Sequence, residues 1–487
     1  MSASNSANLD MTASNRQNDF GKRSSLLIAS HFLKLLVQLL ILYSYARLLS
    51  VEEYGRYQLI WLFSNLLSVI GLFGLPALLL SYSLSSIQQW IQTNQRLFFI
   101  TALLLQMTPI TGLILTSEHF NITEWWLLVA MILIQHGSIL AETIAVKQQL
   151  EKRLLLVNIL YQILFLFAHM IIFYKGYSLK YLLLALIGSL IVKIVGLWNP
   201  FFVIFTKSTA DLYDRKIGEQ WLYLGLNDVL GVLFKWVDKW FILYLVSVAQ
   251  FALYFNGSYE IPVYFLMLSA VGSVMLVEMS RNKSKAHHVL TFHRSAMFLS
   301  SFVFPSFAYL LFYHAELFTL LFSEKYEAAI PIFFVTLWVL PLRITNFTAV
   351  LQVHQRTDII LKGAFYDLMV ALILMFILYP LAGLPGLALA FVLSTWMQTL
   401  YYSWHTSLLL QIPLKRILPF TFLITWWLIA MAAMGISKYL LLNSNIGVKI
   451  IIGALLCGVL LLLMLKQYRN KSNEKDGAHQ LDEEDNE

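Results

Sequence analysis

Long apolar segments recur along almost the whole chain, and short polar stretches separate them. A helix needs about 20 mostly apolar residues, each rising about 1.5 Å, to cross the hydrocarbon core of a bilayer. No loop between the segments is long enough to hold a folded extramembrane domain. The sequence therefore predicts an all-α, polytopic membrane protein with about 14 transmembrane helices. The predicted spans are 24–48, 55–83, 97–116, 124–146, 154–174, 181–206, 220–246, 252–277, 295–313, 328–353, 363–379, 385–410, 417–437 and 447–465.

The composition supports a membrane protein over a soluble one. Of the 487 residues, 59% are hydrophobic and 13% are charged, and the mean hydropathy is +0.70. An average soluble domain has about 25% charged residues, so a soluble globule of this composition would lack polar surface. The single cysteine, Cys457, excludes a disulfide framework and any multi-cysteine metal or redox site.

The basic residues outside the spans are distributed unevenly between the two sides. Cytoplasmic loops of membrane proteins carry an excess of Lys and Arg. If the N-terminus is cytoplasmic, 22 of the 34 Lys and Arg residues fall on the cytoplasmic side and seven on the opposite side. We therefore expect both termini in the cytoplasm. Residues 1–23 contain no apolar segment typical of a cleavable signal peptide.

A weak internal repeat relates two parts of the chain. Ser50–Tyr57 follows the first span and Ser247–Tyr254 follows the seventh, and the two segments share Ser, Val and the final Tyr. At the same offset of six spans, the turn at Lys175–Gly176 pairs with the turn at Gly383–Gly386. A match of this size also arises by chance, so the duplication is a hypothesis. Parallel six-helix repeats are a known transporter plan, with the substrate site between the halves near the bilayer midplane.

The repeat leads to a prediction of the domain organisation. Two parallel-repeat six-helix bundles form the core, two further helices follow them, and both ends of the chain are polar and disordered. The predicted segments are a cytoplasmic N-terminus at 1–23, an N-terminal bundle at 24–207, a cytoplasmic linker at 208–219, a C-terminal bundle at 220–410, two additional helices at 417–465 and a charged cytoplasmic tail at 466–487.

Nine ionisable residues lie inside predicted spans. A charge in hydrocarbon costs several kcal/mol, so such residues face a cavity or a partner. Other polar residues share their helix faces in several spans, and several amphipathic spans in one bundle predict a shared aqueous cavity. Lys and Arg side chains in such a cavity suit an anionic substrate, because they hydrogen-bond to phosphate oxygens. The cations are Lys34, Lys193, Lys235, Lys239 and Arg343, and the anions are Glu142, Asp228, Asp238 and Glu260.

Several of these residues also have a purely structural interpretation. Lys235 and Asp238 are three residues apart on the seventh span, and with Asp228 nearby they form a set that neutralises itself. Glu142 and Glu260 each allow simple structural pairing. The number of charges, spread over both halves, favours the functional interpretation.

Motifs for other classes of chemistry are absent from the sequence. No glycine-rich phosphate loop followed by Lys-Ser or Lys-Thr is present, and no helical zinc motif with paired histidines. The short outer loops leave little room for the reactive carboxylates of a membrane glycosyltransferase or polymerase. We therefore expect a transporter rather than an enzyme, without a cofactor, without a metal and without a nucleic-acid partner.

Four ordered motifs resemble those of bacterial polysaccharide flippases, which belong to the multidrug/oligosaccharidyl-lipid/polysaccharide (MOP) exporter superfamily. Tyr45–Gly55, followed by Gly71–Pro76, is similar to the family's first helical hairpin. Leu320–Ala329 resembles the loop before the tenth helix, and Gly383–Ala390 resembles the glycine-rich start of the twelfth. Asp238, with the segment near Tyr254 after it, fits the start of the second half.

The chain departs from the family at two positions. Glu278–Ser280 stands where the family often has Pro-x-Leu-Ser, and Ser323 replaces a glycine in the outer loop of the second half. In fourteen-span lipid-precursor flippases the last two helices help to form a groove for the lipid tail. By this resemblance, the helices at 417–437 and 447–465 are expected to have the same role.

The resemblance implies that this protein flips undecaprenyl-diphosphate-linked oligosaccharide across the bacterial cytoplasmic membrane, for O-antigen, capsule or a similar surface polysaccharide. The implied mechanism is alternating access, in which the five cations attract the diphosphate and the four anions are candidates for carrying a coupling proton or cation. The implied partners are the lipid-linked oligosaccharide, membrane lipids and other polysaccharide-assembly membrane proteins. Two alternatives stay open. A multidrug or organic-cation antiporter of the same superfamily predicts a mainly acidic cavity, and a polysaccharide polymerase or ligase predicts a long, reactive outer loop.

Overall fold

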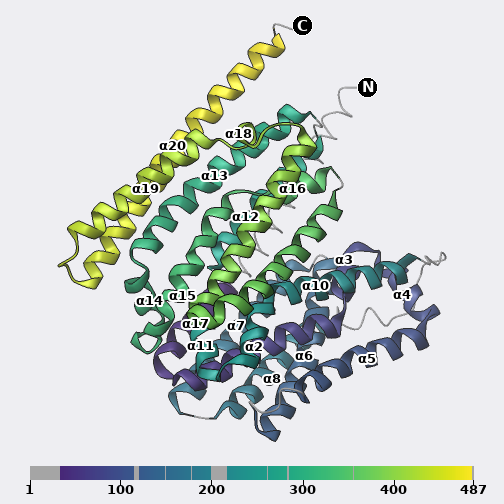
Figure 1. Ribbon diagram of the computed structural model, residues 1–487. Coiled ribbons are helices and arrows are strands. Elements are labelled where there is room, and N and C mark those ends of the chain that lie inside the picture. Colours follow the sequence, from purple (N-terminus) through teal and green to yellow (C-terminus); the bar gives the residue numbers. More distant parts are fainter. Residues whose placement is uncertain are drawn as a thin grey trace, which may run out of the picture. The chain divides into compact units, whose positions relative to one another are not determined.

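The computed structural model describes residues 33–114, 120–148, 150–176, 178–198, 216–259, 261–281, 284–354 and 356–484 (Figure 1). Every regular element within these ranges is a helix, and the ranges contain no strand. Eight of the described helices are long and apolar enough to cross a membrane, or nine if one bent pair counts as a single span. The prediction of an all-α polytopic membrane protein is confirmed, while the number of fourteen spans stays approximate.

The chain divides into two compact units, Met1–Trp236 and Val237–Glu487, and the division falls within helix α10 (Lys216–Leu245). The N-terminal unit contains a helix at 33–48 and the helices before α10. Ser50 caps the second helix through a capping box with Glu53, in which each side chain satisfies a backbone N–H group at the helix start. The helices are α2 (Val51–Leu72), α3 (Leu75–Ser81), α4 (Leu84–Thr93), α5 (Gln95–Ile114), α6 (Ile122–Lys147), α7 (Glu151–Tyr174) and α8 (Leu179–Gly196).

The predicted span 55–83 is not one continuous helix. It breaks into α2 and α3 at Phe73 and Gly74, and the two pieces are bent by 54°. Gly74 has φ +73°, and a Cβ atom at that residue would lie 2.4 Å from the backbone nitrogen of Gly225 on α10. The close approach of α10 therefore needs a glycine at the break, which hydropathy alone did not reveal.

The C-terminal unit combines long helices with several short, broken ones. The predicted spans 252–277 and 328–353 are each interrupted, because Pro262 starts a new helix and Pro341 lies in a 3₁₀ segment. The elements are α11 (Val248–Gly257), α12 (Pro262–Arg281), α13 (Lys285–Phe312), α14 (His314–Phe322), η2 (Glu324–Ala329), α15 (Ile330–Thr336), η3 (Leu337–Ile344), α16 (Phe347–Val353), α17 (Thr357–Leu410), α18 (Leu414–Ile417), α19 (Phe420–Leu440) and α20 (Ile446–Glu484).

The turn predicted at Gly383–Gly386 is present as a kink inside α17. Gly383 has φ 60° and ψ −140°, a conformation essentially restricted to glycine. Ser323 also has a positive φ of 73° with ψ 167°. Ser323 therefore holds a backbone conformation that favours glycine.

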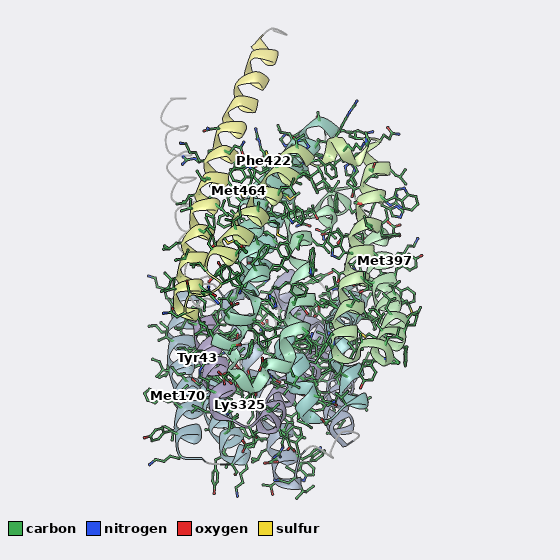
Figure 2. All side chains as sticks on the ribbon, turned by 60° about the vertical axis from the view of Figure 1, so that its left-hand side comes forward. Tyr43, Met170, Lys325, Met397, Phe422 and Met464 are labelled. Carbon is green, nitrogen blue, oxygen red and sulfur yellow. The ribbon has the colours of Figure 1, made fainter. Side chains whose placement is uncertain are left out.

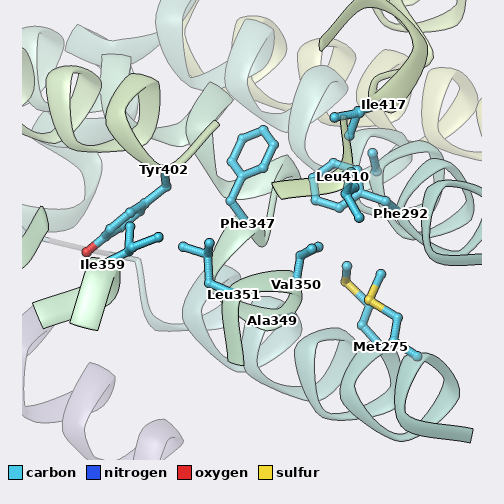
Figure 3. Close-up of a cluster of buried hydrophobic side chains, with 12 residues drawn as sticks. Met275, Phe292, Phe347, Ala349, Val350, Leu351, Ile359, Tyr402, Leu410 and Ile417 are labelled. Carbon is cyan, nitrogen blue, oxygen red and sulfur yellow. The ribbon is translucent and has the colours of Figure 1, made fainter. Parts of the chain in front are cut away.

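The C-terminal unit has an apolar core that Figure 3 shows in close-up. Phe292 of α13 stacks on Phe347 of α16 with ring centroids 4.9 Å apart, and Met275 of α12 belongs to the same buried cluster. α19 and α20 pack against each other and against α13. Elsewhere many large apolar side chains face outward, including Tyr43 and Met397, which are 43% and 53% exposed (Figure 2). Such exposure fits a surface in contact with lipid acyl chains.

The charged tail differs from its predicted disorder, because α20 continues as a helix to Glu484. Residues 466–484 are rich in Lys, Gln, Arg and Glu, which are strong helix formers, and contain no proline. Helix propensity therefore extends the last apolar helix beyond the hydrophobic segment.

Candidate functional site

A polar cavity of about 360 Å³ lies inside the N-terminal unit, and we call it the lysine chamber. The helix at 33–48 and helices α2, α6, α7 and α8 each contribute to its wall. Its polar and ionisable lining residues are Lys34, Gln38, Asn65, Gln135, Ser138, Glu142, Asn158, Tyr161, Gln162 and Lys193. Five apolar helices thus enclose a polar space, which agrees with the cavity expected from their amphipathic faces.

An ion pair lies in the wall of the lysine chamber. The Nζ atom of Lys193 on α8 is 2.8 Å from Oε1 of Glu142 on α6. Lys193 is buried, and its Nζ atom also lies 4.6 Å from the ring centroid of Tyr161 on α7. The pair therefore joins three helices, and removing one partner would leave the other charge without compensation in a membrane-embedded space.

Lys34 gives the lysine chamber an excess of one positive charge. It lies on the helix at 33–48, lines the same cavity and interacts electrostatically with Glu142 and Lys193. Gln135 of α6 accepts a hydrogen bond from Ser64 of α2, which fixes part of the polar wall. The chamber thus offers two ammonium groups, several amides and hydroxyls, and one carboxylate.

The structure brings three of the nine predicted site residues together, namely Lys34, Glu142 and Lys193. Arg343 of η3 lines a separate cavity of about 30 Å³ beside Tyr259 and Tyr264 in the C-terminal unit. The Nζ atom of Lys239 lies 5.9 Å from the ring centroid of Tyr254. Asp228 is partly buried on α10. Glu260 and the side chains of Lys235 and Asp238 lie outside the described residues.

The sequence reasoning missed the contribution of α7 to the chamber. Asn158, Tyr161, Gln162 and Phe165 line it from positions three and four residues apart. This is the same helical periodicity that identified Gln135, Ser138 and Glu142 on α6. The polar face of α7 is detectable from its sequence, although the helix carries no charged residue in its middle.

No group of three or more His, Cys, Asp or Glu side chains in the described part of the chain is arranged to hold a metal ion. The lysine chamber itself contains one carboxylate and two ammonium groups, which is a poor donor set for a cation such as Mg²⁺ or Ca²⁺. Its chemistry suits reversible binding of an anion.

The sequence matches no protein-family model and no curated protein. Three solved structures share the fold. The lipid II flippase MurJ in an inward closed conformation has a TM-score of 0.62 at 15% identity, over 92% of this chain and 99% of that chain. A MOP superfamily transporter from Pyrococcus furiosus, described with a binding pocket of reversed polarity, has a TM-score of 0.56 at 13% identity, over 80% and 94%.

The third structure is an outward-facing multidrug resistance MATE family transporter of the MOP superfamily, with a TM-score of 0.52 at 15% identity, over 80% of this chain and 94% of that chain. The chain therefore has the fold of MOP superfamily transporters, and the superfamily fold that the motifs predicted is confirmed. At this level of identity the likeness shows the fold alone.

Proposed function

We propose that this protein flips undecaprenyl-diphosphate-linked oligosaccharide across the bacterial cytoplasmic membrane to supply surface polysaccharide such as O-antigen or capsule. The observation that carries this proposal is the lysine chamber, a membrane-embedded polar cavity with an excess of positive charge. A diphosphate carries its negative charge on oxygens that accept charge-assisted hydrogen bonds from ammonium groups. The lipid tail stays among the outward-facing apolar side chains.

The Glu142–Lys193 pair gives the chamber a way to release its anion. When a diphosphate binds, its oxygens compete with Glu142 for the ammonium group of Lys193, which lies 2.8 Å from Oε1 of the carboxylate. The displaced carboxylate is left unpaired in a membrane interior, which is costly. Re-forming the ion pair therefore favours release of the anion. Glu142 is thus our candidate for the group that couples transport to an ion gradient.

The similarity to the lipid II flippase MurJ supports a lipid-linked substrate. The remaining predicted cations, Lys235, Lys239 and Arg343, and the anions Asp228, Asp238 and Glu260 belong to the same hypothesis as contributions from the second half. Alternating access between the halves, cytoplasmic termini and cooperation with other polysaccharide-assembly proteins complete the proposal.

A multidrug or organic-cation antiporter is the second candidate. The observation in its favour is the fold shared with the outward-facing MATE transporter. An organic cation would need Glu142 to be available, yet this carboxylate is paired with Lys193 and faces a second lysine. The charge balance of the lysine chamber therefore favours the anionic substrate.

The test uses purified protein in liposomes with a fluorescent polyprenyl-diphosphate saccharide, whose exposed fraction is bleached by a membrane-impermeant quencher. We expect the wild type to accelerate transfer between leaflets. The double variant Lys34→Ala, Lys193→Ala should lower that rate about tenfold or more, which corresponds to about 1.4 kcal/mol. The control Lys325→Ala removes an exposed lysine of η2 (Figure 2) and should leave the rate unchanged.

Two outcomes would contradict the proposal. One is a wild-type protein that moves the diphosphate-linked saccharide no faster than empty liposomes. The other is equal acceleration of a saccharide linked to the same lipid without phosphate, since the chamber's lysines would then play no part in recognition. Potential-driven movement of an organic cation by the wild type would favour the antiporter.

A further inference from the structure

The lysine chamber has an ionic end and an uncharged end. At the ionic end, Lys193 of α8 pairs with Glu142 of α6, and Lys34 interacts electrostatically with both. Gln135 of α6 lies seven residues before Glu142, which is about 10 Å along the helix axis. The cavity therefore extends about two helical turns beyond its charged groups.

Amide side chains outnumber the charged groups of the chamber. Four helical segments contribute them, namely the helix at 33–48, α2, α6 and α7. Each amide offers two N–H donors and one carbonyl acceptor. The five amides are Gln38, Asn65, Gln135, Asn158 and Gln162.

Two of these amides have no protein partner for their side chains. Within the described part of the chain, the side chains of Asn65 and Gln162 make no hydrogen bond. Asn65 is exposed, whereas Gln162 is 6% exposed, and both line the chamber. An amide in a membrane-embedded cavity is costly unless it is hydrogen-bonded, so water or a bound ligand supplies the partners of these two.

Two aromatic rings lie at the uncharged end and their positions are fixed. Trp61 is one turn before Asn65 on α2, and its ring centroid is 5.7 Å from that of Phe165. The backbone carbonyl oxygen of Phe165 lies 2.7 Å from Nδ1 of buried His169, so Nδ1 donates to it. Nε2 of His169 then accepts a hydrogen bond from the hydroxyl of Tyr57, at 3.1 Å. The uncharged end is thus a wall of aromatic rings beside amides.

We propose that this end of the chamber selects an uncharged sugar attached directly to the diphosphate, and rejects an acidic sugar at that position. The inference rests on the diphosphate recognition proposed above and names the class of sugar beside it. Hydroxyl and acetamido groups of a sugar both donate and accept hydrogen bonds, as amides do. The apolar face of a sugar ring packs against aromatic rings. Asn65 and Gln162 are therefore our candidates for specificity-determining residues.

The charge balance of the chamber excludes an acidic sugar. Two ammonium groups and one carboxylate give it a single excess positive charge. A diphosphate that joins a lipid to a sugar carries two negative charges, so the occupied chamber has one excess negative charge. A uronic acid would add another negative charge among uncharged amides, and uncompensated charge in a membrane interior is costly. A neutral sugar adds no charge.

The volume of the chamber limits how much of the glycan it can recognise. Pockets for small ligands enclose about 300–1,000 Å³, and the chamber, at about 360 Å³, lies near the lower end of this range. It therefore suits the diphosphate and the sugar beside it better than a whole oligosaccharide.

The experiment compares three geranyl diphosphate esters as ligands of the purified protein in detergent. One ester carries N-acetylglucosamine, one carries glucuronic acid, and one carries a methyl group, which keeps both diphosphate charges but has no sugar. Isothermal titration gives a Kd for each. We expect the wild type to bind the N-acetylglucosamine ester about tenfold or more tightly than either of the others, because a site that hydrogen-bonds a ligand discriminates against analogues without those groups.

The double variant Asn65→Leu, Gln162→Met removes both amides and leaves the chamber's charges in place. Its preference for the N-acetylglucosamine ester over the methyl ester should fall about tenfold. Asn65→Leu alone changes an exposed residue and should lower this preference in the same direction, which keeps the test open if the double variant does not fold. The matched control, Gln398→Met, removes an amide of α17 in the C-terminal unit and should keep the wild-type preference.

Three outcomes would overturn the inference. They are equal Kd values of the wild type for the N-acetylglucosamine and methyl esters, equal values for the N-acetylglucosamine and glucuronic acid esters, and an unchanged preference in the double variant.

A further variant separates this inference from the proposed function. Lys34→Ala, Lys193→Ala should weaken the binding of all three esters, because each contains the diphosphate. If it does so while the wild type does not discriminate among the esters, diphosphate recognition stands and the sugar selection fails. If the wild type binds none of the three, both fail.

Discussion

The two units begin with the same local structure and then use their interiors differently. Ser50 caps α2 and Ser247 caps α11, each through a capping box with the residue three positions later. The tyrosine four residues beyond that partner is buried in both units. Tyr57 donates a hydrogen bond to His169, whereas the ring of Tyr254 lies 5.9 Å from Nζ of Lys239. The weak sequence repeat therefore corresponds to a repeated helix start with diverged polar partners.

The cavities of the two units show when a polar residue in a span becomes part of a binding site. The N-terminal unit has two polar chambers of about 360 and 370 Å³, lined by five and by four helices, respectively. In the C-terminal unit, Arg343 lines a cavity of about 30 Å³ among mostly apolar neighbours. A polar face on one helix therefore indicates a chamber when the neighbouring helices carry polar residues at the same depth.

The largest expected effect comes from breaking the ion pair of the lysine chamber. Lys193→Met leaves the Glu142 carboxylate without its partner; breaking a fully buried pair costs about 3–5 kcal/mol, and the partial exposure of Glu142 makes this an upper bound. We expect a fall in the thermal midpoint of the purified protein and loss of saccharide transfer. Lys239→Met, which removes a cation of the C-terminal unit, should have a smaller effect on stability.

The swapped variant Glu142→Lys, Lys193→Glu restores the pair with reversed polarity and should recover most of the lost stability. Equal destabilisation by Lys193→Met and Lys239→Met would show that these lysines contribute equally to the stability of their units.

The paired turns of the two units should respond differently to an added methyl group. A Cβ atom at Gly386 would lie 2.2 Å from the carbonyl oxygen of Leu378, while one at Gly176 would meet no atom within 4 Å. Gly386→Ala should therefore lower the thermal midpoint more than Gly176→Ala, which carries only the backbone strain of φ +64°, about 1–2 kcal/mol. Similar midpoints for the two variants would contradict this packing.

The sequence predicted the helical class and part of the site because both depend on local patterns. Apolar length identified the membrane helices, and a shared helix face brought Gln135, Ser138 and Glu142 into one wall of the lysine chamber. The glycine pattern at Gly383–Gly386 predicted the kink in α17, since its φ of 60° is a property of the residue itself.

The features that the sequence did not predict depend on contacts between segments far apart in the chain. The break at Gly74 follows from the approach of Gly225, about 150 residues later, and no local pattern reports it. The pairing of Lys193 with Glu142 joins two helices whose relative rotation is fixed by packing. The hydrogen bond between Tyr57 and His169 joins residues 112 positions apart, and no local pattern reports it.

Replacing Ser323, between α14 and η2, tests whether its backbone is strained. Ser323 has φ 73° and ψ 167°, a conformation that costs a non-glycine residue about 1–3 kcal/mol. Ser323→Gly should raise the thermal midpoint, because it relieves this strain. The greater flexibility of glycine in the unfolded chain opposes part of this gain in stability. Ser323→Ala is the control and should give no increase. A lowered midpoint for Ser323→Gly would show that the serine is not strained.

The two helix caps should contribute equally if the repeat is real at the level of local structure. Ser50 accepts a hydrogen bond from the backbone of Glu53, and Ser247 accepts one from the backbone of Gln250. Replacing either serine with alanine should cost about 1 kcal/mol of stability, within the range measured for N-caps. The comparison needs thermal midpoints of both variants under the same conditions. A large fall in the thermal midpoint for one variant and none for the other would show that the two caps are not equivalent.

The smallest expected effect concerns an ion pair of the C-terminal unit. Lys438 of α19 donates a hydrogen bond to Glu316 of α14. Burial by itself would raise the pKa of Glu316, but the hydrogen bond and charge of Lys438, with the charge of Lys449, outweigh burial and lower it. Because the folded pKa is below the unfolded one, the pair stabilises the protein above the unfolded pKa, about 4.3.

That stabilisation is lost as the pH falls through the lower pKa of the folded state. Glu316 is partly exposed, so we expect at most about 1 kcal/mol. Thermal midpoints measured from neutral to acidic pH should fall more steeply for the wild type than for Glu316→Gln, which has no carboxylate to titrate. Lys438→Met should flatten the profile in the same way, because the pKa of Glu316 then returns towards its ordinary value. Parallel profiles for the wild type and Glu316→Gln would mean that this ion pair contributes nothing to the stability of the C-terminal unit.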